Sequence, residues 1–339
     1  MPAKQILEAL LAAAETPTRT GYVLRRVLPD SILDLFIGWE RPTGLPVLLL
    51  QVPSLIPLHG LDDISTRAVH VHSGRLPDDV GGRKSVVVTL TELSLLDEFC
   101  LVLDQLVRGL QVICTADDAV RLLAARLRAW LLLFSPDTGR MSDERQRGLF
   151  GELTVLETLA NRKPGWIEVL RAWTGPDRRD RDFNFTRLLI EVKTNIAGGR
   201  DRIQVTNEHQ LDGHNGVPPL LLWVLTLAQD EKGVTLPARV KGIRTILEAD
   251  PTCLVLFEEK IEAAGYSDLQ FEPDHSEPYR VVTQRIYHVL GDFPHLRPSD
   301  LRPGVLNVSY SVDLKDCVRF LNDENAVYEL LTPDTPGGT

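Results

Sequence analysis

The segment from Asp182 to Thr194 constrains this chain more than any other, because it carries charged side chains into an otherwise apolar stretch. Residues from Leu188 onward alternate as in a β-strand, where side chains two apart share a face. Glu191 and Lys193 therefore point to one side, and the apolar residues beside them point to the other. A buried charge is costly unless it is paired or bound to a metal ion, so this strand requires a partner for its charges.

The residues before this strand predict a hairpin that brings a carboxylate to it. If Thr186-Arg187 form the tip of a two-residue or four-residue turn, Asp182 lies opposite Glu191. Directly opposed Cβ atoms are about 5 Å apart, so the two carboxylates repel each other unless a cation lies between them. A three-residue loop would shift the register by one residue and separate them.

These residue types suit the hydrolysis of phosphodiesters with a metal ion. Two carboxylates beside a backbone carbonyl offer hard oxygen ligands for Mg²⁺ or Mn²⁺. Such an ion polarises a phosphate and helps to form hydroxide from water, and an adjacent lysine can stabilise the charge of the transition state. Asp177 and Asp180 are rival first ligands, but neither lies opposite Glu191 in this register.

An upstream helix is predicted from Ser142, a good N-cap, to about Asn161. Its apolar stripe contains Leu149, Leu153, Leu156 and Ala160. Glu152 lies at the edge of this stripe, where its carboxylate could reach the sheet. A solvated glutamate at the rim of the helix is an equally good interpretation.

Several motifs now follow one another along the chain: Gly151-Glu152-Leu153, Trp173-x-Gly175-Pro176, Asp182-Phe183-x-Phe185, Ile190-Glu191-Val192-Lys193-Thr194 and Gln204-Val205-Thr206-Asn207-Glu208-x-Gln210-Leu211. Together they resemble the bacterial PD-(D/E)XK motif protein family, a former domain-of-unknown-function family of the restriction-endonuclease-like superfamily. The resemblance is clear over residues 148–212. Arg181 stands where the motif has its proline, a position at which the family often varies.

The resemblance implies a Mg²⁺- or Mn²⁺-dependent DNA endonuclease and a role for each motif residue. Asp182, Glu191 and the backbone carbonyl of Val192 would hold the metal, and Lys193 would be the catalytic lysine. Glu152 would assist the metal site. Gln210 would lie near the active site on the following helix. Trp173 is interpreted as a packing residue, and Gly175-Pro176 as the turn that follows it.

The resemblance also implies partners. Such proteins resemble parts of restriction or phage-defence gene clusters, often beside an ATPase and a methyltransferase. Cutting both DNA strands with one site per chain would favour a homodimer. The alternative function is a non-catalytic, nuclease-like subunit that binds DNA or assembles a defence complex.

The fold expected is mixed α/β, with an α+β restriction-endonuclease-like core in which helices flank a mixed sheet. The turn-rich stretch at residues 135–139 divides the chain. Residues 1–138 would form an N-terminal α/β domain for target recognition or partner contact, and residues 139–332 the nuclease-like domain. Residues 333–339 would be a disordered tail.

Charge argues against a uniformly basic surface, because the 339 residues carry a net charge of −10. Residues 171–202 differ, with eight Lys and Arg against five Asp and Glu. Their arginines are candidate contacts to the DNA backbone: Arg178, Arg179, Arg181 and Arg187. A solvated loop of alternating charges is the equally good alternative.

The chain has no apolar run long enough to cross a membrane and no signal peptide, so we expect a cytoplasmic protein. Its four cysteines are scattered along the sequence without a short-spaced pair. They are typical of reduced thiols and form neither a zinc cluster nor a disulfide framework.

Overall fold

The computed structural model of the protein describes residues 1–13, 21–29, 34–61, 66, 68–74, 83–131, 141–162, 164–177, 180–213, 218–268, 271 and 276–331. The chain forms two compact units, Met1–Gly139 with Leu247–Glu262 and Arg140–Ile246 with Ala263–Thr339. The domains expected from the sequence, 1–138 and 139–332, stay a prediction. The expected tail at 333–339 lies outside the described residues.

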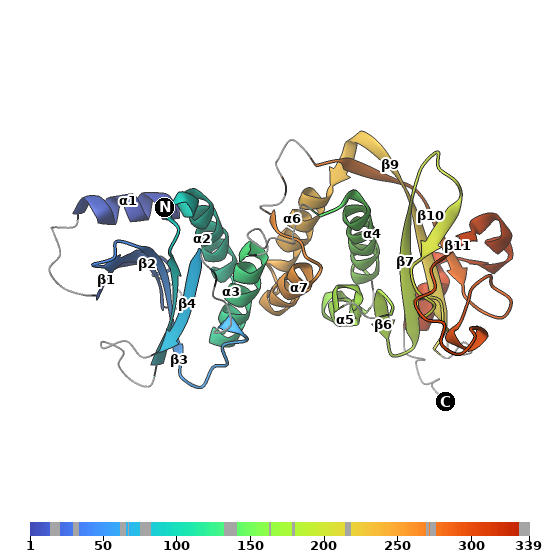
Figure 1. Ribbon diagram of the computed structural model, residues 1–339, viewed down its shortest axis with the longest axis horizontal. Helices are drawn as coiled ribbons and strands as arrows, with labels where there is room; N and C mark the ends of the chain where they lie inside the picture. Colours follow the sequence, from blue (N-terminus) through green and yellow to red (C-terminus); the bar gives the residue numbers. More distant parts are fainter. Residues whose placement is uncertain are drawn as a thin grey trace, which may run out of the picture. The chain divides into compact units, whose positions relative to one another are not determined.

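The first unit is built on a five-stranded antiparallel sheet in the order β1-β2-β3-β5-β4 (Figure 1). Its strands are β1 (Gly21–Arg26), β2 (Asp34–Arg41), β3 (Pro46–Pro53), β4 (Val69–Gly74) and β5 (Arg83–Leu90). β3 is almost entirely apolar because it is the central strand, with both faces buried. β2 and β3 form a hairpin around Pro42-Thr43-Gly44, where the alternating apolar pattern is interrupted.

Helices complete the first unit: α1 (Ala3–Ala13), α2 (Leu96–Leu110), α3 (Ala116–Leu131) and α7 (Pro251–Ala263). α7 comes from far along the chain and is joined to α3 by three ion pairs. These are Arg121–Glu259, Arg126–Glu258 and Arg128–Glu262. These ion pairs connect α7 to α3 within the first unit.

The second unit contains a mixed five-stranded sheet in the order β12-β10-β9-β7-β6. Its strands are β6 (Phe183–Phe185), β7 (Leu188–Ile196), β9 (Leu220–Thr235), β10 (Pro278–His288) and β12 (Leu321–Asn322). β7 and β9 are parallel, and the other neighbours are antiparallel. The segment Leu220–Leu227 is buried almost throughout, as its apolar run predicts, because β9 lies in the middle of the sheet.

Two helices pack beside β7 and β6 in this unit, α4 (Asp143–Ala160) and α5 (Trp166–Ala172) (Figure 1). The Ser142 side chain accepts a hydrogen bond from the Arg145 N–H, which confirms the predicted N-cap. Gly151 lets α4 approach the sheet closely. A Cβ at this position would lie 2.4 Å from Thr194 Cγ2. The neighbouring Glu152 is thereby brought next to β7.

A small sheet of β8 (Arg202–Val205) and β11 (Tyr310–Asp313) covers one face of the large sheet, and their buried side chains share one core. The alternation of residues 305–312 predicts a strand, but only Tyr310–Asp313 pair as β11, and residues 301–309 lie outside any strand. Residues Leu314–Phe320 form a 3₁₀ helix that leads into β12. α6 (Leu236–Leu247) and α8 (Glu324–Leu331) are the other α-helices described in this unit. The predicted fold class, a mixed sheet flanked by helices in a restriction-endonuclease-like α+β core, is confirmed.

Candidate active site

The β6–β7 hairpin has the register predicted from the sequence. Phe185 pairs with Leu188, and Phe183 pairs with Ile190. β6 begins only at Phe183, which pairs with Ile190, so the edge of β7 beyond Ile190 is open to other groups. Asp182 uses this opening: its Oδ2 accepts a hydrogen bond of 2.7 Å from the Val192 N–H.

The same geometry orients the carbonyl of Val192. In an extended strand the N–H and C=O of one residue point to the same side. The Val192 carbonyl therefore points to the strand edge where Asp182 lies. This is the arrangement that a metal ligand set of Asp182, Glu191 and the Val192 carbonyl requires.

Glu191 and Lys193 lie on one face of β7, as their spacing predicts. Glu191 is only 1 % exposed, and its Oε1 lies 2.8 Å from Lys193 Nζ. Burial, followed by the charge of Asp182, raises the pKa of Glu191 to about 8. Burial alone would lower the pKa of Lys193, but the charges of Glu191 and Asp182 outweigh it and the pKa is raised. The lysine is therefore a firmly charged ammonium among carboxylates.

Glu152 joins this cluster from α4. Its Oε2 accepts a 2.8 Å hydrogen bond from Trp173 Nε1. Burial and the charge of Asp182 raise the pKa of Glu152 well above its ordinary value. Burial also raises the pKa of Asp182, against the opposing effect of Lys193. The structure thus favours the interpretation of Glu152 as a site residue over that of a solvated glutamate.

Gln210 also reaches the site, although the helix expected for it is wrong, since residues 208–211 form a turn. Its Oε1 accepts hydrogen bonds from Lys193 Nζ at 3.1 Å, from the Thr206 N–H at 2.9 Å and from Thr206 Oγ1 at 3.1 Å. Gln210 therefore fixes the ammonium of Lys193 relative to the end of β8. The turn itself is held by Glu208, which accepts hydrogen bonds from the N–H groups of Asn307 and Val308.

The candidate DNA contacts are distributed differently from the prediction. Arg178 and Arg179 lie outside the described residues. Arg187 is exposed at the hairpin turn. Arg181 is only 5 % exposed, and its guanidinium donates to the backbone oxygen of Asp212. Arg181 is therefore held inside the unit beside Glu191, and a DNA contact at the surface does not fit this residue.

The residues present fit a hard divalent cation. Three carboxylates, those of Glu152, Asp182 and Glu191, gather near a single lysine, and burial leaves their mutual repulsion poorly screened. In the described part of the chain, no three His, Cys, Asp or Glu side chains form a closed ligand set. Mg²⁺ needs no such set, because it keeps several waters and is usually held by one or two carboxylates and substrate phosphates. Asp177 and Asp180, the rival ligands, are exposed.

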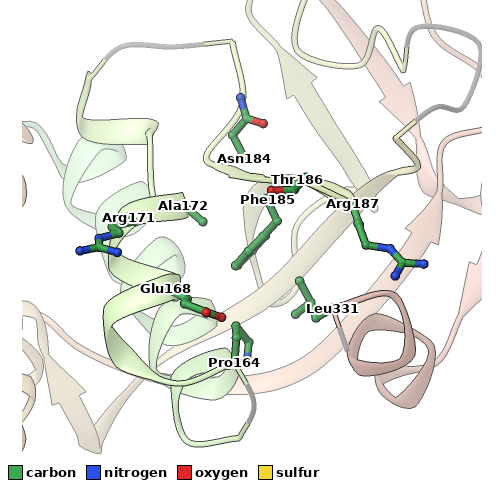
Figure 2. Close-up of a pocket in the computed structure, with 9 residues that line it drawn as sticks. All are labelled: Pro164, Glu168, Arg171, Ala172, Asn184, Phe185, Thr186, Arg187 and Leu331. Carbon is green, nitrogen blue, oxygen red and sulfur yellow. The ribbon is translucent and has the colours of Figure 1, made fainter. Parts of the chain in front are cut away.

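Two hollows lie near β7 but outside the carboxylate cluster. One, of about 400 Å³, lies at the hairpin turn, between α5 and the end of α8. In Figure 2 the ring of Phe185 points into this pocket, whereas the guanidinium groups of Arg171 and Arg187 point away from it. The other, of about 520 Å³, follows β7 beyond Lys193 and includes Asn195, Thr226 and Thr283.

Among the helices that the structure describes, none is both long and apolar enough to cross a lipid bilayer.

Of the comparisons with known proteins, one found a match. A search of curated proteins and a search of solved structures each found no match. A family model described as "Putative PD-(D/E)XK family member, (DUF4420)" matches residues 5–315, which is most of the chain. The match extends over the N-terminal residues, where the sequence offered no recognisable motif. On this evidence the chain belongs to that PD-(D/E)XK family.

Proposed function

We propose that this protein is a metal-dependent DNA endonuclease that hydrolyses phosphodiester bonds, acting in the cytoplasm in a bacterial restriction or phage-defence system. One observation carries the proposal. Asp182, whose carboxylate accepts from the Val192 N–H at the edge of β7, lies close to the buried Glu191–Lys193 pair on the face of the same strand. An ordinary surface ion pair needs no second and third carboxylate, whereas a cation site does.

Asp182, Glu191 and the carbonyl of Val192 would hold the ion, with Glu152 supporting it. When bound, Mg²⁺ or Mn²⁺ would polarise the scissile phosphate and lower the pKa of a coordinated water. Lys193 would orient the attacking water and stabilise the negative charge that develops on the phosphate. Gln210 would hold Lys193 in place for this task.

DNA is the proposed substrate, with Arg187 at the hairpin turn as a contact to its backbone. We further propose that an ATPase and a methyltransferase of the same defence cluster are partners, and that a homodimer would cut both strands. The N-terminal unit is the candidate for target recognition or partner contact. These proposals follow from the family and not from a contact in the structure.

The test is cleavage of supercoiled plasmid and phage DNA with Mg²⁺ or Mn²⁺ by the wild type and by Asp182→Asn. We expect nicking or linearisation that EDTA abolishes and that the variant lacks. Equal cleavage by both proteins would refute the site. Absence of cleavage by the wild type, also with the neighbouring gene products added, would favour the alternative of a nuclease-like subunit that does not cut.

A further inference from the structure

Trp173 contacts the carboxylate cluster directly. It is fully buried, and its indole N–H donates a 2.8 Å hydrogen bond to Glu152 Oε2. The same residue forms an antiparallel bridge with Phe183, the first residue of β6. One side chain therefore links the helix that carries Glu152 to the strand that follows Asp182.

The next two residues hold the backbone of Asp182. The N–H groups of Thr174 and Gly175 both donate to the Asp182 carbonyl, at 2.7 and 3.1 Å. The Thr174 hydroxyl donates to the carbonyl of Arg181 at 2.9 Å. Asp182 is thus anchored on one side by this segment and on the other by the Val192 N–H.

Gly175 lies directly against both carboxylates. A Cβ at this position would lie 2.5 Å from Glu152 Oε2 and 2.9 Å from Asp182 Oδ1. Both distances are shorter than van der Waals contact, so any larger residue must displace an oxygen of Glu152, of Asp182 or of both. The absence of a side chain here lets the two oxygens approach one common point.

We propose that Trp173-Thr174-Gly175 is a positioning element that fixes the carboxylates of Glu152 and Asp182 relative to each other and to the divalent ion. This inference rests on the proposed metal site and extends it, because the segment holds the ligands and touches no substrate. Burial of the indole alone would need no hydrogen bond to a carboxylate. A role restricted to the turn would not require Gly175 to lie against two carboxylate oxygens.

The matched test compares two buried tryptophans. Trp173→Phe keeps most of the ring and removes the N–H that Glu152 accepts. Trp223→Phe makes the same change at a fully buried residue whose N–H has no hydrogen-bond partner within the described part of the chain. The full-length proteins would be titrated with Mn²⁺ by calorimetry, with Glu191→Gln as the variant expected to abolish binding.

Groups that orient metal ligands typically account for about 10-fold to 100-fold in metal affinity. We therefore expect Trp173→Phe to weaken Mn²⁺ binding at least about tenfold, and Trp223→Phe to leave it unchanged. In a Glu152→Gln background the Trp173→Phe change should have no further effect, because the two residues act as a unit. Gly175→Ala should also weaken Mn²⁺ binding.

A second measurement needs no change at Trp173. The protein has five tryptophans, so its ¹⁵N-labelled indoles give five N–H resonances. Glu152→Gln should shift one of them strongly, and Mg²⁺ should shift the same one in the wild type. If neither change moves any resonance, the inference is wrong.

The outcomes separate this inference from the proposed function. Wild-type binding that Glu191→Gln abolishes but that Trp173→Phe leaves unchanged would overturn the positioning element and uphold the metal site. No Mn²⁺ binding by the wild type would overturn both.

Discussion

Replacement of Gly151 by alanine is predicted to destabilise the second unit, although alanine is normally the better residue in a helix. The added Cβ would lie 2.4 Å from Thr194 Cγ2, with the side chains of Leu225 and Val192 at 3.5 and 3.6 Å. Carbon atoms pack at about 3.5–4.0 Å, so roughly 1 Å of space must be created. Thr194 is β-branched and has little rotamer freedom, so α4 itself must move away from β7.

The magnitude follows from two opposing terms. Forcing an extra methyl group into a packed interface costs about 1–3 kcal/mol. The intrinsic gain of alanine over glycine in a helix is about 1 kcal/mol. We therefore expect Gly151→Ala to lower the free energy of unfolding by up to about 2 kcal/mol and to displace Glu152, which follows it in the helix.

The same helix offers a matched control. A Cβ at Gly148 would meet nothing within 4 Å, so Gly148→Ala should raise stability by about 0.5–1 kcal/mol. Thermal unfolding of both variants beside the wild type, followed by calorimetry and circular dichroism, measures the difference. If Gly151→Ala proves as stable as Gly148→Ala, the close approach of α4 to β7 is wrong, and with it the position of Glu152.

Two further predictions concern the charged cluster. Because the pKa of Glu191 is raised to about 8, its burial lowers the stability of the metal-free protein progressively as pH rises from about 4.5 to about 8. The free energy of unfolding of Glu191→Gln should therefore match that of the wild type near pH 4.5 and exceed it by a few kcal/mol above pH 8. Urea unfolding in EDTA measures this difference. A difference in unfolding free energy that shrinks with rising pH would contradict the burial of an ionisable group. Gln210→Leu removes the acceptor that holds Lys193 and should lower kcat about 10-fold to 100-fold with little change in Mn²⁺ affinity. Gln204→Leu, at an exposed position of β8, is its control in the cleavage assay. Equal kcat values for the two variants would exclude the positioning role of Gln210.

The sequence predicted the hairpin and its carboxylates because alternation and turn length are local properties. Apolar residues around Glu191 and Lys193 determined which side each residue faces, and the register followed from the turn at Thr186-Arg187. The observed pairing of Phe185 with Leu188 confirms this reasoning. Ser142 likewise marked the start of α4, since an N-cap acts on the N–H groups next to it.

Other features depended on contacts between distant residues. Trp173 is interpreted from the sequence as a packing residue. Nothing in the neighbouring sequence indicates that its indole N–H would donate a hydrogen bond to Glu152, which lies 21 positions earlier. Arg181 lies in a charged stretch that is typical of a surface loop, but the residue is buried. Its guanidinium donates a hydrogen bond to the backbone oxygen of Asp212. Gln210 lies on a turn and not on the helix that the family resemblance implied, and its side chain still reaches Lys193.

The proposed catalytic role of Lys193 depends on a metal site built by Asp182 and Glu191. Lys193→Met tests it most directly, in a single preparation assayed for Mn²⁺ binding by calorimetry and for cleavage of supercoiled plasmid. We expect this variant still to bind Mn²⁺, because the metal ligands remain. We expect its cleavage rate to fall about 100-fold or more, as is typical when a group that stabilises the transition state is removed. Cleavage at the wild-type rate by Lys193→Met would contradict a catalytic role for Lys193.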